Sequence, residues 1–145
     1  MKAAVQYLLL LLFSIIFFTS CKTTKDVLVE PQKDLNGTWK IVMVTRNTVD
    51  ITEYIDSSGF RLTLANDNTY TLQSNNIPFV VNSNGKWSVD DPQYPYNLSF
   101  NPTDSSSTFT GSIGTPASKG LRNLEVTFSP GCRANSYVYT FEKIQ

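Results

Sequence analysis

The chain has 145 residues, enough for one domain, and its 12 basic residues balance its 12 acidic ones. A nucleic-acid partner is not expected, because phosphate binding requires a basic excess or a basic face. Histidine is absent, which removes the commonest general base and the commonest nitrogen ligand of metals, so we expect no ordinary catalytic triad, no metal and no cofactor.

The N-terminus has the pattern of an export signal. Lys2 supplies a positive charge, and an apolar run follows from Tyr7 to Phe18, interrupted only by Ser14. This length fits the hydrophobic region of a signal peptide and is short for a membrane-spanning helix. We predict a signal peptide over residues 1–20. The alternatives are an uncleaved membrane helix and an ordinary signal peptide whose cleavage site happens to precede a cysteine.

The end of this segment, Phe18-Thr19-Ser20-Cys21, resembles the lipobox of bacterial lipoproteins. The resemblance implies cleavage between Ser20 and Cys21 and acylation of Cys21. Two or more acyl chains hold a protein stably on a membrane, at about 0.8 kcal/mol per buried CH₂. The resemblance therefore implies that the membrane is a partner, through an N-terminal lipid anchor.

The residues after Cys21 bear on localisation. In lipoproteins of this kind, Asp directly after the cysteine favours the inner membrane, and Lys22 here favours the outer membrane. Some Bacteroidetes lipoproteins reach the cell surface through an acidic cluster, which residues 22–26 lack, so the periplasmic side is favoured. Residues 21–34 are predicted to be a polar tether, although the apolar Val27–Val29 would also suit an edge strand.

From Leu35 onward the sequence predicts antiparallel β-structure. Apolar and polar residues alternate, β-branched and aromatic residues are frequent, and turn residues recur about every ten positions. One helical turn is predicted within residues 50–56 and a tight hairpin turn at residues 66–68, where Asn and Asp tolerate positive φ. Strands are predicted, in chain order, over residues 37–46, 59–65, 69–73, 77–82, 85–89, 94–100, 107–113, 121–128 and 136–143.

Eight to nine strands with short links indicate an up-and-down meander. Closing the meander into a barrel removes its exposed edges, and eight strands leave an interior that side chains fill or that holds one small ligand. We predict an all-β barrel domain over residues 35–145. The alternation predicts inward-facing side chains at Trp39, Ile41 and Met43, at Phe60, Leu62 and Leu64, at Tyr70 and Leu72, at Tyr94, Tyr96, Leu98 and Phe100, and at Tyr137, Tyr139 and Phe141.

The start of this domain, Gly37-Thr38-Trp39, resembles the Gly-x-Trp opening of lipocalins, in which the Trp plugs the closed end of the barrel. The segments NGTWK, FRLTLANDNTYTL, GKWSVDD, YNLSF and SYVYTFEK are similar to a group of Bacteroidetes lipoproteins with lipocalin-like domains of unknown function. The similarity covers nearly all of residues 35–145 and implies a lipocalin-like barrel. The chain is shorter than large lipocalins and lacks their disulfide, which argues against a large ligand cavity.

Two features were weighed as catalytic candidates. Cys132 is the only thiol besides Cys21; the adjacent Arg133 would lower its pKa, but no base is near in sequence, and a lone buried cysteine behaves as a small hydrophobe. Asp90 and Asp91 are adjacent, and neighbouring residues on a strand point to opposite faces, so we predict a solvated turn. We therefore expect no enzymatic activity. If the Asp90 and Asp91 carboxylates pointed into one cleft, a hydrolase activity would again be an alternative.

The aromatic residues are the remaining candidates for a function. An apolar wall with a few hydroxyl groups suits a small hydrophobic ligand, and Tyr94 and Tyr96 are predicted at the mouth of the barrel. The competing interpretation is core packing, because a domain of this size needs most of its rings to fold. The predicted barrel lining consists of Trp39, Phe60, Tyr70, Trp87, Tyr94, Tyr96, Tyr137 and Tyr139.

The leading hypothesis is a lipid-anchored envelope protein that binds a small hydrophobic ligand without converting it. The second hypothesis is a structural or inhibitory lipoprotein with a filled barrel that contacts another envelope protein. An open pocket of a few hundred Å³ favours the first hypothesis. A filled barrel with an exposed apolar patch favours the second.

Overall fold

A computed structural model describes residues 31–74, 77, 79–118, 121–132 and 134–144. The predicted signal peptide, Cys21, Val27–Val29, Pro78 and Arg133 lie outside the described residues. The compact unit begins at Pro31, so residues 31–34 of the predicted tether belong to it. The described strands are β1 (Gly37–Arg46), β2 (Val49–Asp50), β3 (Arg61–Leu64), β4 (Thr69–Gln73), β5 (Gly85–Val89), β6 (Asn97–Pro102), β7 (Phe109–Gly114), β8 (Ala117–Ser118), β9 (Leu121–Arg122), β10 (Leu124–Phe128) and β11 (Tyr137–Lys143).

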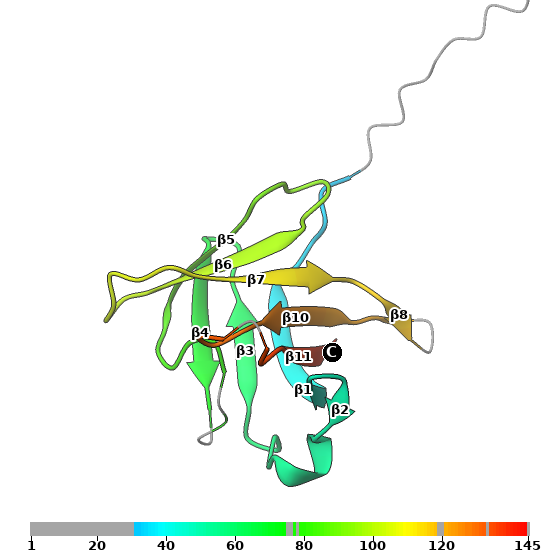
Figure 1. Cartoon of the computed structure of the whole chain (residues 1–145). Helices are drawn as coiled ribbons and strands as arrows, with labels where there is room; N and C mark the ends of the chain where they lie inside the picture. Colours follow the sequence, from blue (N-terminus) through cyan, green and yellow to red (C-terminus); the bar gives the residue numbers. More distant parts are fainter. Residues whose placement is uncertain (1–30, 75–76, 78, 119–120, 133, 145) are drawn as a thin grey trace, which may run out of the picture. The chain divides into compact units, whose positions relative to one another are not determined.

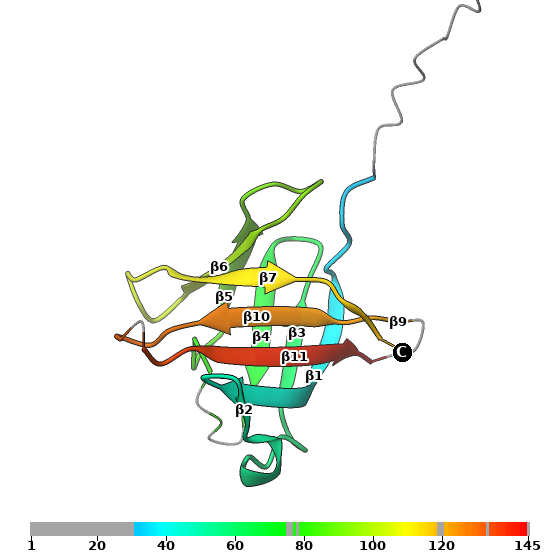
Figure 2. The ribbon, with the colours of Figure 1, turned by 45° about the vertical axis from the view of Figure 1, so that its right-hand side comes forward.

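Eight of the described strands form a closed antiparallel barrel (Figures 1 and 2). The order around the barrel is β1-β3-β4-β5-β6-β7-β10-β11, and β11 pairs with β1 from Arg46↔Tyr137 to Trp39↔Lys143. Strand β2 folds back on the end of β1, and β8 and β9 form a separate two-stranded ribbon. The predicted all-β, up-and-down barrel is confirmed.

The first strand differs from the predicted alternation in its second half. Its pairing with β11 runs from Ile41↔Phe141 to Met43↔Thr140, so Val42 is an extra residue in a β-bulge. A bulge reverses the alternation beyond it. Val44 is therefore fully buried and Met43 is exposed, and the prediction that Met43 faces inward is wrong.

The predicted strand over residues 77–82 is not a strand in its described part. Ile77 and Val81 are buried, and Phe79 contacts the interior rings, so the apolar run fills one end of the barrel instead of joining the sheet. At this point the side chain of Asn84 accepts a hydrogen bond from the backbone N–H of Leu72 at 2.8 Å. Short apolar runs of this kind are ambiguous in sequence.

Both predicted turns are present. A 3₁₀ helix occupies Thr52–Tyr54, and the hairpin between β3 and β4 has Asn68 at φ 63°. In that hairpin the carboxylate of Asp67 accepts hydrogen bonds from the N–H and the hydroxyl of Thr69. The described part of the chain contains no helix with the length and apolarity that crossing a membrane requires.

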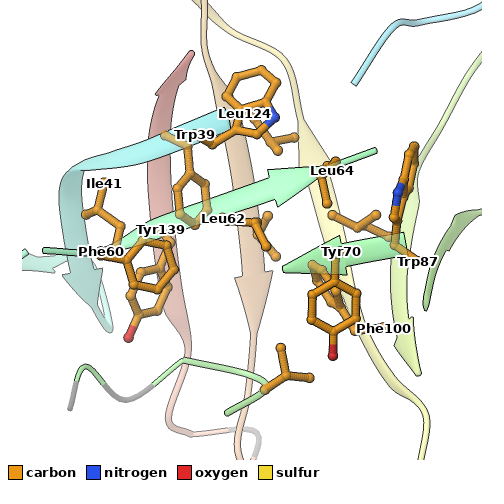
Figure 3. Packing of buried hydrophobic residues seen from close by; sticks show 14 of the residues in the cluster. Trp39, Ile41, Phe60, Leu62, Leu64, Tyr70, Trp87, Phe100, Leu124 and Tyr139 are labelled. Atoms are coloured by element: carbon orange, nitrogen blue, oxygen red, sulfur yellow. The ribbon is translucent and has the colours of Figure 1, made fainter. Parts of the chain in front are cut away.

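Aromatic and aliphatic side chains fill the barrel interior (Figure 3). Phe79 is at the centre of the ring cluster: it contacts Phe60, Phe100, Phe128, Tyr139 and Phe141, with centroid distances of 5.4–6.0 Å. Interiors packed in this way have few voids. The barrel is therefore a packed core, as expected for eight strands with large side chains.

The barrel has two ends, which we name by the residues that close them. At the Trp39 end lie the start of β1, the end of β11, the β3–β4 hairpin and the β5–β6 connection. At the Phe79 end lie the end of β1, the start of β11, the β6–β7 connection and the segment that carries Phe79.

Candidate functional site

Most of the predicted lining residues are core residues. Five of them are less than a tenth exposed: Trp39, Phe60, Tyr70, Trp87 and Tyr139. Burial raises the pKa of the Tyr70 and Tyr139 phenols to about 12, because the apolar surroundings disfavour a phenolate. Tyr137 is half-buried and stacks on Tyr139 with a centroid distance of 6.5 Å. Tyr137, Tyr139 and Phe141 stack in a row, and Tyr70 packs edge-on against Phe100 at 5.0 Å.

Tyr94 and Tyr96 do not line the barrel; they are 61% and 69% exposed. The turn between β5 and β6 explains their position, because its carboxylates cap backbone groups. Asp90 accepts hydrogen bonds from the N–H groups of Tyr96 and Asn97, and Asp91 accepts from Tyr94. The sequence predicts that both tyrosines face inward together with Leu98 and Phe100. In the structure Leu98 and Phe100, which lie in β6, are buried, and the two tyrosines before β6 are not.

The two adjacent carboxylates are turn caps. Hydrogen bonds from the Asn97 and Tyr96 backbone hold the pKa of Asp90 down at about 2, so this carboxyl is ionised at neutral pH and is a poor proton donor. Among the described residues no three His, Cys, Asp or Glu side chains gather as metal ligands. Cys132 is exposed in the β10–β11 connection, not buried. Asp90 and Asp91 thus lie in an exposed turn, as the sequence predicts.

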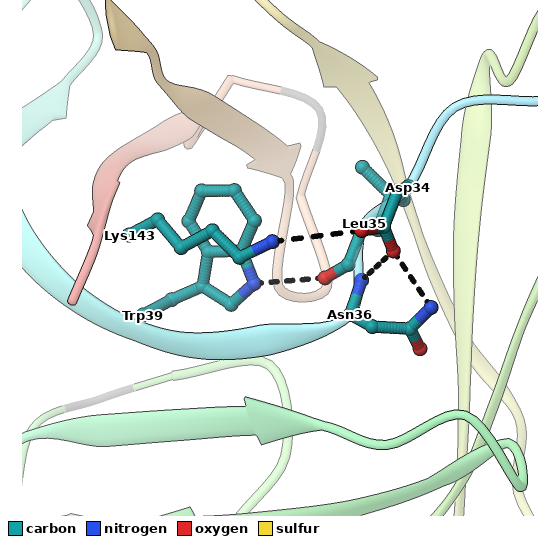
Figure 4. Close-up of polar contacts among 5 residues, drawn as sticks. All are labelled: Asp34, Leu35, Asn36, Trp39 and Lys143. Carbon is teal, nitrogen blue, oxygen red and sulfur yellow. Dashed lines mark hydrogen bonds and ion pairs between the residues drawn. The ribbon is translucent and has the colours of Figure 1, made fainter. Parts of the chain in front are cut away.

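The Trp39 end is closed by hydrogen bonds and charge (Figure 4). The indole N–H of Trp39 donates to the carbonyl of Leu35 at 3.0 Å, and the Lys143 ammonium lies 5.7 Å from the indole centroid and 3.8 Å from the Asp34 carboxylate. Gly37 has φ +130°, a conformation that L side chains rarely adopt, so the backbone favours the Gly of Gly-x-Trp, and the Lys143 side chain packs over the space that a Cβ would fill.

A groove of about 350 Å³ runs beside this end. One wall is the segment from Gln32 to Asn36, and the other is formed by the β3–β4 hairpin and the end of β5. We call it the asparagine groove, because Asn36, Asn66 and Asn68 line it. A second groove of about 260 Å³ lies against the other side of the same segment and contacts Trp39 and Arg122.

The groove at the Phe79 end is aromatic. It has a volume of about 290 Å³ and is walled by Phe79, Val80, Phe109, Phe128 and Pro130. We call it the aromatic groove. Phe128 links it to the core, because this ring stacks on Tyr139 at 5.4 Å and 12° and contacts Phe79 edge-on at 6.0 Å.

Of the residues that line these two grooves, the sequence predicts only Trp87 as a binding residue, in the barrel lining. Phe109 is the first residue of β7 and Phe128 the last of β10, and at strand ends the period-2 pattern no longer fixes which way a side chain points. For Asn66 and Asn68 the sequence predicts a turn, and for Asn36 it predicts no binding role. The sequence feature that points to the aromatic groove is the presence of aromatic residues at strand ends, next to long connections.

The described residues form a small closed β-barrel with grooves at both of its ends. A family model described as a domain of unknown function, DUF5004, matches residues 19–142, and the chain belongs to this family. Comparison with curated proteins gave no match. Comparison with solved structures gave no match either.

Proposed function

We propose that the protein is a lipid-anchored, lipocalin-like lipoprotein of a bacterial outer membrane that faces the periplasm and binds a small hydrophobic ligand without converting it. The observation that carries this proposal is the aromatic groove, which continues into the core ring stack through Phe128. The resemblance of Phe18–Cys21 to a lipobox supports the anchor at Cys21, and the resemblance to Bacteroidetes lipoproteins supports the source.

The ligand site differs from the one expected from the sequence. Rings occupy the barrel interior, so a ligand binds at the end of the barrel rather than within it. A volume of about 290 Å³ is near the lower limit of about 300 Å³ for small-molecule pockets. The proposed ligand is therefore small, and it contacts ring faces and edges.

The proposal includes that the bound ligand is not chemically converted. The described wall of the aromatic groove offers hydroxyl groups as its side-chain polar atoms, from Thr108, Thr110 and Ser129. The hydroxyl of Thr108 donates to Asn101 at 2.6 Å, and that of Thr110 bonds with Ser99 at 2.9 Å. Hydroxyl groups without a neighbouring base are not activated as nucleophiles.

Binding is tested with residues 31–145, expressed without the anchor, by native mass spectrometry followed by extraction of any bound molecule. We expect a small apolar adduct that is lost in Phe109→Ser, because this substitution removes one wall of the groove. Tyr54→Ser, which alters an exposed ring that does not line the groove, is the matched control. An adduct that persists in Phe109→Ser and disappears in Tyr54→Ser contradicts the site.

The anchor is tested separately with Cys21→Ser in the full chain. We expect this variant to leave the membrane fraction and to retain its signal peptide, because the sulfur that accepts the acyl chains is lost. Membrane association with a processed N-terminus would contradict the lipid anchor and would leave the ligand site untouched.

A second candidate function is contact with another envelope protein. It is favoured by the filled interior and by exposed apolar side chains beside the end of β1, Val49 and Tyr54, the latter 88% exposed. Exposed rings of this kind are common in interfaces. Loss of a co-purifying protein in Tyr54→Ser, with Phe109→Ser unaffected, would favour this candidate.

A further inference from the structure

The asparagine groove is a built feature of the barrel and not a gap beside a loose segment. The backbone N–H of Lys33 donates to the carbonyl of Pro92 at 2.8 Å, which fixes the segment against the β5–β6 connection. Leu35 is buried beside it and accepts the Trp39 indole N–H. On the opposite wall the N–H of Trp87 donates to the carbonyl of Asn68 at 2.8 Å, which joins β5 to the hairpin.

The lining of this groove is rich in neutral hydrogen-bonding groups. Asn36, Asn66, Asn68 and Gln32 contribute amides, each with donors and an acceptor, and Ser88 contributes a hydroxyl. The described lining contains no carboxylate, and Lys33 is its one cation. A ligand whose groups both donate and accept hydrogen bonds matches this lining better than an anion, a cation or a hydrocarbon does.

One amide atom of the groove lacks a partner. The backbone N–H and the Nδ2 of Asn36 both donate to Asp34, at 3.0 and 2.7 Å, which fixes the orientation of the side chain (Figure 4). Its Oδ1 is buried and has no hydrogen-bond partner among the described residues. This atom has no accessible surface, so the Asn36 amide holds the wall of the groove rigid, and the hydrogen bonds to a ligand come from the exposed amides of Asn66 and Asn68.

The floor of the groove is apolar and fixed. Trp87 is 9% exposed, and its indole N–H donates to the carbonyl of Ala65 at 3.2 Å. Val89 and Pro92 extend this surface. Amides along the walls above an indole and aliphatic floor suit a ring that has hydroxyl groups on its rim and C–H groups on its face.

We propose that the asparagine groove is a binding site for a neutral carbohydrate, one or two sugar rings in size. The hydroxyl groups of the sugar bond with the amides of Asn66 and Asn68. A face of the ring lies against Trp87. The site is at the opposite end of the barrel from the aromatic groove, and the inference does not depend on the function proposed above.

The test is an equilibrium titration of the full chain in detergent with maltose, cellobiose and N,N′-diacetylchitobiose, followed by tryptophan fluorescence. The chain has two Trp residues, and the fluorescence of both is followed in the unsubstituted chain, because Trp39 holds Leu35 in the groove wall. We expect a saturable change at millimolar sugar. A response to diacetylchitobiose alone indicates an amino-sugar polymer as the source, and a response to the glucosides indicates free or lipid-linked hexose.

The double variant Asn66→Ala, Asn68→Gly is expected to weaken binding at least about tenfold, because it removes two amides, each worth about one hydrogen bond. Glycine retains the positive φ of position 68. The matched control is Asn47→Gly, another asparagine with positive φ, in the β1–β2 hairpin at the other end. Melting temperatures confirm that both variants fold.

Three outcomes overturn the inference. One is the absence of a saturable response to all three disaccharides. Another is equal affinity in the groove variant and in the Asn47→Gly control. The third is a response to inorganic phosphate in place of the sugars, which would make the groove an anion site centred on Lys33.

Discussion

The two ends of the barrel are closed by different physical means. At the Trp39 end a hydrogen bond, a cation over an indole and an ion pair hold the segment before β1 in place. At the Phe79 end the closure is a ring set among five other rings. The first kind of closure leaves a polar groove beside it and the second leaves an aromatic groove. The kind of ligand that each groove suits thus follows from the groups that close that end of the barrel.

The largest expected effect is at the Trp39 end. Trp39→Ala should lower the free energy of unfolding by about 3–5 kcal/mol, because a buried indole is replaced by a cavity and its hydrogen bond to Leu35 is lost. Urea denaturation measures the change, with Tyr54→Ala as an exposed control that should stay within about 0.5 kcal/mol. An unchanged urea denaturation midpoint for Trp39→Ala would show that Trp39 does not close this end of the barrel.

At the Phe79 end we expect a somewhat smaller effect. Phe79→Ala should cost about 2–4 kcal/mol, because the ring contacts the core but is itself half-buried. It should also expose the rings beneath it, seen as increased binding of an apolar fluorescent dye. Full retention of stability with no added dye binding would show that Phe79 does not close this end.

Tyr70 provides a test with the opposite sign. Its hydroxyl is buried without a hydrogen-bond partner among the described residues. Tyr70→Phe should therefore raise the free energy of unfolding, by about 1 kcal/mol, because a desolvated hydroxyl is removed and no bond is broken. Chemical denaturation measures it against Tyr54→Phe, an exposed control. A loss of stability in Tyr70→Phe would reveal a bond that this hydroxyl makes in solution.

The smallest expected effect is a dependence on acid at the Trp39 end. The folded pKa of Asp90 is about 2 and the unfolded value is about 3.9. Because the pKa is lowered on folding, the stabilisation is present above about pH 4 and is lost as the pH falls toward 2. Asp90→Asn should be less stable than the parent at pH 7, and the difference should shrink from about pH 4 downward and vanish below about pH 2. A constant difference across this range would contradict the cap.

The alternation of the sequence predicted the barrel because period-2 burial is a local property. Leu62 and Leu64 are buried on β3 and Phe60 directly before it, as predicted, and Leu98 and Phe100 are buried on β6. Phe109, Phe128 and the asparagines were not recognised, because the connections that gather them are set by tertiary contacts. The bulge at Val42 and the turn capped by Asp90 likewise depend on partners far along the chain or outside the strand pattern.

The pairing of β1 with β11 has a kinetic consequence. The paired residues are 91 positions apart at Arg46↔Tyr137 (137 − 46) and 104 apart at Trp39↔Lys143 (143 − 39). Contacts of such long range slow folding to milliseconds or seconds. The barrel also cannot close on the ribosome before its last strand has emerged. A chain with this topology completes folding only after β11 has been synthesised, and until then β1 and β10 present open edges on which other chains can pair.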